Sequence, residues 1–246
     1  MDTKERVIEI TTGRYGKGSL EQNITVNSIF GSEYARERFA TYFYQYNVIH
    51  ELGHGIMNFN TKIRPHPVHE EKLVNDFAVA YWKHYGEDGM INNLTLIINY
   101  ALEHLKCPAE IGVDHITYAK ENWNKEDFYN FNDYGWFQFS LVNQALSEIR
   151  PLESVLTEMG VEVNNVPRQR TLTFSSLGED GIAEILSEVA DALLEWGVEL
   201  PDIYLVLSND PAMHALVFAS VRLLELTLPI LGIENEMVMV HQSSNR

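Results

Sequence analysis

A long amphipathic helix, predicted over about residues 33–58, is the strongest constraint on how this 246-residue chain folds. Its apolar side chains recur at steps of three and four residues, which places them on one buried face. They are Ala35, Phe39, Tyr42, Tyr46, Ile49, Gly53 and Ile56. The preceding Gly31-Ser32 supplies a helix breaker and an N-cap. His50 and His54 lie at the edge of that face, so a metal bound there would be half sheltered and reachable from one side.

The same helix carries the motif His50-Glu51-Leu52-Gly53-His54. Two histidines four residues apart lie one above the other on a helix, a spacing at which both imidazoles can bind one Zn²⁺. Glu51 then stands beside the metal, where a carboxylate can take a proton from zinc-bound water. The alternative is that these are ordinary polar residues on a helix flank. Gly53 is unfavourable inside a helix, by about 1 kcal/mol relative to alanine. It indicates either an edge strand that passes close above the helix or simple close packing.

A third protein ligand is expected, because catalytic zinc takes three and leaves one position for water. A third histidine of the metzincin type would stand at position 60, which is Asn60, so that class is excluded. A second helix is predicted from Pro67 until Gly86 stops it. The acids and imidazoles near its start are the candidates: Glu71, Glu70, His69 and His66. Asp76, further along, is expected to be a solvated or supporting carboxylate.

The second helix reads Glu71-Lys72-Leu73-Val74-Asn75-Asp76-Phe77-Ala78, and together with the first motif it resembles the gluzincins. In these zinc peptidases the third ligand is a glutamate on the helix after HExxH. The sequence looks most like the pattern HExxH…ExxA(D/N)xFA, shared by HtpX-like and soluble ImmA/IrrE-type peptidases. Val74 replaces the usual Ala, the gap between the motifs is shorter than in the ImmA/IrrE type, and the resemblance covers about residues 47–82. It implies that Glu51 is the general base, that Asn75 steadies a ligand, and that the metal is held by His50, His54 and Glu71.

Composition narrows the class of partner. The net charge of −17 argues against nucleic acid and anionic membranes, because both repel an acidic surface. A single cysteine excludes an intrachain disulfide. The first residues lack the apolar core of a signal peptide, and the longest apolar stretch, 212–233, is interrupted by charges and Pro229. A cytoplasmic protein is therefore expected, with neither membrane nor nucleic acid as a partner.

The predicted fold class is α+β, with a mostly helical zincin-like domain over residues 1–165. Residues 7–11 and 24–29 alternate like strands, so an N-terminal β-hairpin is predicted, with the Gly-rich segment 13–19 as its turn rather than a phosphate loop. A strongly apolar helix is predicted over 91–106. Aromatic side chains dominate residues 114–139 and are interpreted as core, with a substrate wall as the alternative. A helix over 136–159, with a break at Pro151, completes this part.

A small α/β domain is predicted over residues 168–246. Its pattern reads as strand, helix, strand, helix and strand over 171–175, 180–196, 203–207, 211–231 and 236–241. This βαβαβ order implies a small parallel sheet. The domain is expected to support or present partners to the first one, and a homo-oligomer formed through it is one option.

The leading functional hypothesis is a zinc-dependent metallopeptidase acting on a peptide or protein substrate, in which Glu51 assists attack of zinc-bound water on the peptide bond. A second electrophile should stabilise the oxyanion. The candidates are Tyr81, His84, Tyr85, His115 and Tyr134. Two alternatives differ in class. One is a zincin-fold metal-binding regulatory or interaction protein without peptidase activity, and the other is a zinc hydrolase for a small amide.

Overall fold

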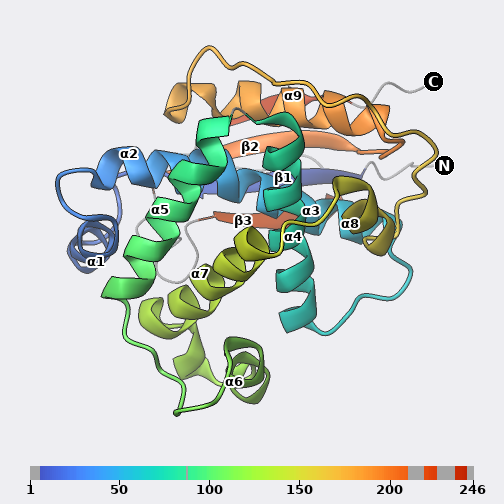
Figure 1. Cartoon of the computed structure of the whole chain (residues 1–246). Coiled ribbons are helices and arrows are strands. Elements are labelled where there is room, and N and C mark those ends of the chain that lie inside the picture. Colours follow the sequence, from blue (N-terminus) through green and yellow to red (C-terminus); the bar gives the residue numbers. More distant parts are fainter. Residues whose placement is uncertain (1–5, 87, 210–218, 226–235, 243–246) are drawn as a thin grey trace.

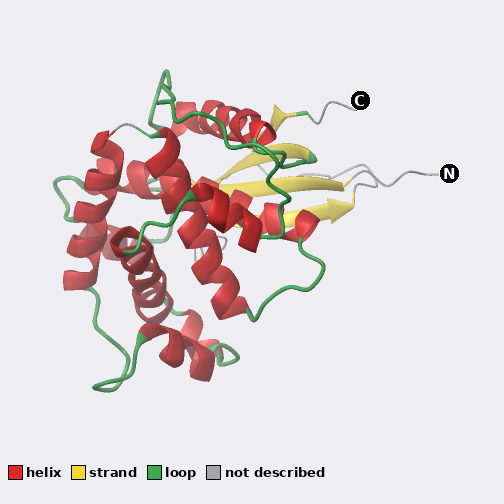
Figure 2. Ribbon diagram, turned by 45° about the vertical axis from the view of Figure 1, so that its right-hand side comes forward, coloured by secondary structure: helices red, strands yellow, loops and turns green. Residues whose placement is uncertain are grey.

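The computed structural model describes residues 6–86, 88–209, 219–225 and 236–242. Within these residues the fold is α+β and mostly helical, with most of the helices gathered to one side of a small sheet (Figure 2). Among the residues described, no helix combines the length and the apolar character needed to span a membrane.

The sheet has four strands in the order β3-β1-β2-β4. Their bounds are Arg6–Gly13 for β1, Asp202–Ser208 for β2, Ala219–Glu225 for β3 and Glu236–His241 for β4. β1 runs parallel to β2, with Ile8 opposite Ile203, whereas β3 and β4 are antiparallel to their neighbours. The first strand of the chain therefore lies between strands from its last fifth (Figure 1). The sheet thus crosses the predicted boundary between residues 1–165 and 168–246.

The predicted N-terminal hairpin is wrong. Residues 24–29 lie inside helix α1, Leu20–Phe30, and the Gly-rich segment 13–19 connects β1 to this helix. Ser19 caps α1 in a capping box with Gln22, so two backbone N–H groups at the helix start are satisfied by side chains. The strand-like alternation misled because Val26, Ile29 and Phe30 are also spaced to share one helical face, and this face is buried.

The predicted parallel βαβαβ unit is also wrong in two of its elements. Residues 171–175 form no strand, and 219–225, expected in a helix, form strand β3. The rest of that expected helix lies outside the described residues. Helix α9, Ile182–Glu195, follows a 3₁₀ turn at Glu179–Gly181, and with β2 and β4 it confirms the other three elements. The predicted parallel pairing is wrong for these two strands, because β4 pairs antiparallel to β2. Short apolar runs do not distinguish a strand from a buried helix by periodicity, which explains the error at β3.

The helices that carry the motifs are confirmed. The first predicted helix is one continuous run: α2 over Ala35–Phe39, a π-helical segment η1 over Ala40–Tyr46, and α3 over Asn47–Asn60. The second is α4, Pro67–Tyr85, with His66 as N-cap and Gly86 as C-cap. The remaining elements are α5 Asp88–His104, α6 His115–Asn122, a 3₁₀ turn η2 Glu126–Tyr129, α7 Phe131–Ser147 and α8 Leu152–Glu158. The helix predicted over 136–159 is thus divided in two before α8.

Helix α3 is sandwiched between α4 and the sheet, and two glycines permit the close approach. A Cβ added at Gly53 would lie 3.0 Å from Phe77 and 3.1 Å from Val74, both on α4. A Cβ at Gly55 would lie 2.7 Å from Ile8 on β1. Gly53 therefore serves close helix–helix packing rather than the passage of an edge strand. This packing fixes the distance between the two helices that carry the motifs.

The aromatic residues of 114–139 mostly form a second small core between α6, η2 and α7, as the core interpretation predicted. Its fully buried members are Val68, Ala119, Phe128, Phe137 and Leu141. Tyr134 packs at the edge of this cluster and also reaches the site described next.

Candidate metal centre

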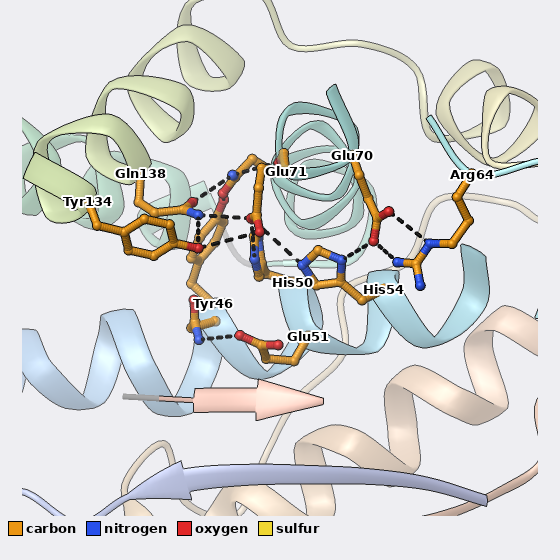
Figure 3. A network of polar contacts seen from close by, with 11 residues as sticks. Tyr46, His50, Glu51, His54, Arg64, Glu70, Glu71, Tyr134 and Gln138 are labelled. Atoms are coloured by element: carbon orange, nitrogen blue, oxygen red, sulfur yellow. Dashed lines mark hydrogen bonds and ion pairs between the residues drawn. The ribbon is translucent and has the colours of Figure 1, made fainter. Parts of the chain in front are cut away.

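His50, His54 and Glu71 converge, as Figure 3 shows. The Nε2 atoms of His50 and His54 lie 3.4 and 3.7 Å from Oε2 of Glu71, and the two ring centroids are 5.0 Å apart. Two ligands about 2.0–2.1 Å from a tetrahedral zinc ion are separated by about 3.4 Å, so these distances fit a shared zinc ion. Within the described part of the chain, this trio is the one group of histidine, cysteine and acidic residues close enough to hold a metal.

The charges of the site suit metal binding. Burial alone would raise the pKa of Glu71, but the imidazoles of His54 and His50 overcome it and hold that pKa well below its usual range. In turn, burial would lower the pKa of His54, and Glu71 outweighs burial and raises it. Burial raises the pKa of the Glu51 carboxyl, with the two imidazoles opposing. Glu71 is therefore ionised and suited to ligate a metal, whereas the raised pKa of Glu51 suits proton uptake.

Glu70 contacts the opposite nitrogen of His54. Its Oε1 lies 2.6 Å from Nδ1 of His54, and the same carboxylate pairs with the Arg64 guanidinium, which also contacts Asn58. A carboxylate at Nδ1 favours the tautomer with the proton there, which leaves the lone pair of Nε2 for a metal. Glu70, weighed above as an alternative ligand, is therefore placed to orient a ligand instead.

A Glu70→Ala protein is expected to bind zinc about 10–100-fold more weakly and still reach one ion per chain at saturation, because it loses only the orientation of His54. Titration against a chromophoric zinc chelator measures this. Glu153→Ala, an exposed acid on α8, is the control and should leave the affinity unchanged. If the Glu70 variant binds no zinc while Glu71→Ala binds normally, the two glutamates have the reverse roles.

Side chains from α7 form hydrogen bonds with the carboxylate of Glu71, the candidate third ligand. Gln138 Nε2 donates to Glu71 Oε2 at 2.8 Å, and the Tyr134 hydroxyl lies 3.4 Å from Glu71 Oε1. Asn75 donates to the Glu71 carbonyl and to Gln138 Oε1, and it accepts from the Tyr46 hydroxyl at 2.6 Å. Asn75 thus lies where the resemblance placed a supporting residue, and it reaches the Glu71 carboxylate through Gln138.

A cavity of about 70 Å³ opens beside His50 and Glu51. Its walls are largely aromatic and come from the π-helical segment and from α7: Tyr42, Phe43, Phe131, Tyr134 and Phe139. Glu51 also lines this cavity, and Asn47 Nδ2 donates to its Oε1 at 3.3 Å. A small apolar group can therefore lie in this cavity next to the carboxylate.

The five candidates for a second electrophile differ in whether they lie near Glu71 and the cavity. Tyr134 contacts Glu71 and lines the cavity. His115 faces Gln144 at 3.1 Å. The other three lie at the C-terminal end of α4, where Tyr85 accepts a hydrogen bond from Trp196 and the His84 ring packs 5.2 Å from the same indole. Tyr81, with its ring 5.0 Å from that of Tyr85, belongs to this same cluster.

Three further residues weighed from the sequence lie outside the trio. His66 accepts from the Val68 N–H and caps α4, and His69 is exposed. Asp76 is buried in ion pairs with Lys72 at 2.8 Å and Arg150 at 3.1 Å, so it is structural rather than solvated.

Sequence reasoning missed Gln138, the π-helical form of η1 and the Arg64–Glu70 pair. The four-residue spacing of Tyr134 and Gln138 places them on one face of α7, but nothing in the sequence directs that face toward α4.

Comparison with protein-family models, with curated proteins and with solved structures finds no match to this chain.

Proposed function

We propose that this chain is a zinc-dependent metallopeptidase of gluzincin type. The convergence of His50, His54 and Glu71 within ligand distance, with Glu51 lining the adjoining cavity, is the observation that carries the proposal. His50, His54 and Glu71 would hold the metal. When bound, zinc supplies a Lewis acid that polarises a carbonyl and lowers the pKa of a water molecule.

The protein's own groups account for the proton transfers. Glu51 accepts a proton from the attacking water at its carboxylate, and it then returns this proton to the departing amine. Its raised pKa suits both steps, because a base poised nearer neutrality takes and gives a proton readily. Tyr134 is the candidate to donate a hydrogen bond to the oxygen on which negative charge develops.

Strand β3 offers a place for an extended peptide. It lies at one edge of the sheet and packs against α3, and in Figure 3 a strand passes below Glu51. Among the described residues, β3 pairs only with β1. Addition of a strand to a sheet edge is a common way to bind an extended peptide. A peptide added there would run past Glu51, with a small apolar side chain in the aromatic cavity.

Metal analysis combined with peptide digestion tests the proposal. The purified chain should carry about one zinc ion, cleave members of a peptide library, lose cleavage on chelation and regain it on addition of zinc. One zinc per chain that supports the melting temperature, without cleavage of any peptide, would instead favour a metal-binding protein without peptidase activity.

A further inference from the structure

We propose that a second cavity, on another face of η1, binds a small organic ammonium ion. This cavity has a volume of about 440 Å³, within the range typical of small-molecule sites. It lies between η1, the end of α4, the start of α5 and residues 172–178. None of its lining residues lines the cavity at the metal centre. The inference concerns binding alone and does not depend on hydrolysis.

The cavity is preformed by hydrogen bonds from neighbouring elements. Residues 172–178 belong to the loop that joins α8 to α9 and runs along α9 at the top of Figure 1. The Leu172 N–H donates to the Tyr85 carbonyl at 2.8 Å, and Gln45 Nε2 donates to the Leu177 carbonyl at 2.9 Å. A ligand would therefore enter without having to order this segment, which lowers the cost of binding.

Aromatic rings supply the apolar wall. The rings of Trp82 and Phe174 lie edge to face with centroids 5.9 Å apart, and Met90 and Leu177 extend the surface. The indole N–H of Trp82 already donates to the Gln45 carbonyl at 3.2 Å. The N–H group of Trp82 is therefore engaged within the protein, and its ring is the part that can contact a ligand. Aromatic faces attract cations.

The polar groups of the cavity favour a positive charge. Glu37 is the one charged side chain among the described residues that line it. Gln45 is only 5% exposed, and its Nε2 donates to the Leu177 carbonyl. Its Oε1 accepts no hydrogen bond from the described residues, so it can accept one from a ligand. No lysine, arginine or histidine is among these lining residues, so an anion would meet a carboxylate without compensation.

Titration calorimetry on the full chain tests this proposal with three probes of similar shape and different charge. 2-Phenylethylammonium should bind at least tenfold more tightly than neutral 2-phenylethanol and anionic 3-phenylpropionate. Glu37→Gln should weaken its binding at least fivefold, whereas Glu33→Gln, an exposed acid in the turn before α2 and outside the cavity, should not.

Phe174→Ala should weaken binding of the ammonium probe as well, which separates this cavity from adsorption to the acidic surface. Thermal melts of the variants report whether each protein is folded. No binding of the ammonium probe, equal binding of the three probes, or equal effects of the Glu37 and Glu33 variants would overturn the proposal.

Discussion

A Glu51→Gln protein is expected to retain about one zinc ion per chain and to lose about 10²–10⁴-fold in kcat, the usual contribution of a positioned acid–base group. Gln keeps the size and the hydrogen-bonding oxygen of Glu51 but cannot accept the proton of the attacking water. The proposed metal ligands are untouched, because Glu51 contacts Asn47 rather than Glu71. Binding and turnover should therefore separate in this one variant.

The measurement pairs zinc content with single-turnover hydrolysis of a peptide that the wild-type protein cleaves. Glu110→Gln, an exposed acid in the loop after α5, is the matched control and should keep both zinc and activity. Undiminished cleavage by the Glu51 variant would rule out its role as general base, even if the metal site is correct.

The site was predictable to the extent that it depends on local patterns. His50, Glu51 and His54 lie on a helix whose apolar repeat is long, and Pro67 and Gly86 mark the ends of the helix that carries Glu71. Local periodicity and capping involve residues that are close in the chain, so both can be recognised from a single sequence. The relative placement of the two helices is fixed by Gly53 against Val74, which only tertiary packing reveals.

Two of the missed features depend on distant contacts. Gln138 reaches Glu71 across 67 residues of chain, and β1 pairs with β2 and β3 from the other end of the molecule. Neither the Gln138–Glu71 contact nor the pairing of β1 with β2 and β3 produces a repeating pattern in the sequence of the residues involved. The error at α1 has a different cause, because a short stretch can satisfy both a strand and a helix pattern until the capping box at Ser19 decides.

A Glu71→Gln protein is expected to lose the zinc-dependent rise in melting temperature. At a free zinc concentration of about 1,000 times Kd, binding stabilises a folded chain by about 4 kcal/mol. For a chain of this size, that corresponds to a rise of about 8–16 °C. Loss of a ligand should weaken binding by more than the 100-fold limit for supporting residues, which removes most of this rise. Calorimetric scans with zinc and with chelator measure the difference, and Glu110→Gln should behave as wild type.

The wild-type protein should be more stable than Glu71→Gln by a margin that depends on pH. This margin should change with pH in opposite directions with and without zinc. In the zinc-free protein His54 has a pKa raised above its usual 6.5 and Glu71 one held well below 4.5. The contribution of the His54 imidazole to folding stability is therefore complete below about pH 6.5 and is lost as the pH rises through its raised pKa. The contribution of the Glu71 carboxylate persists until the pH falls to its own lowered pKa. Zinc needs neutral imidazoles, so its contribution grows over the same rise in pH.

Scans at pH 6 and pH 8 should accordingly show the wild-type advantage over Glu71→Gln falling with pH under chelator and increasing with pH in zinc. Both trends would have the same origin, because protons and the proposed metal ion would compete for the imidazoles next to one carboxylate. An advantage that falls with pH under both conditions would show that Glu71 acts only through its charge on the imidazoles and that zinc adds nothing at this site. The His50–His54–Glu71 trio would then not be a metal site.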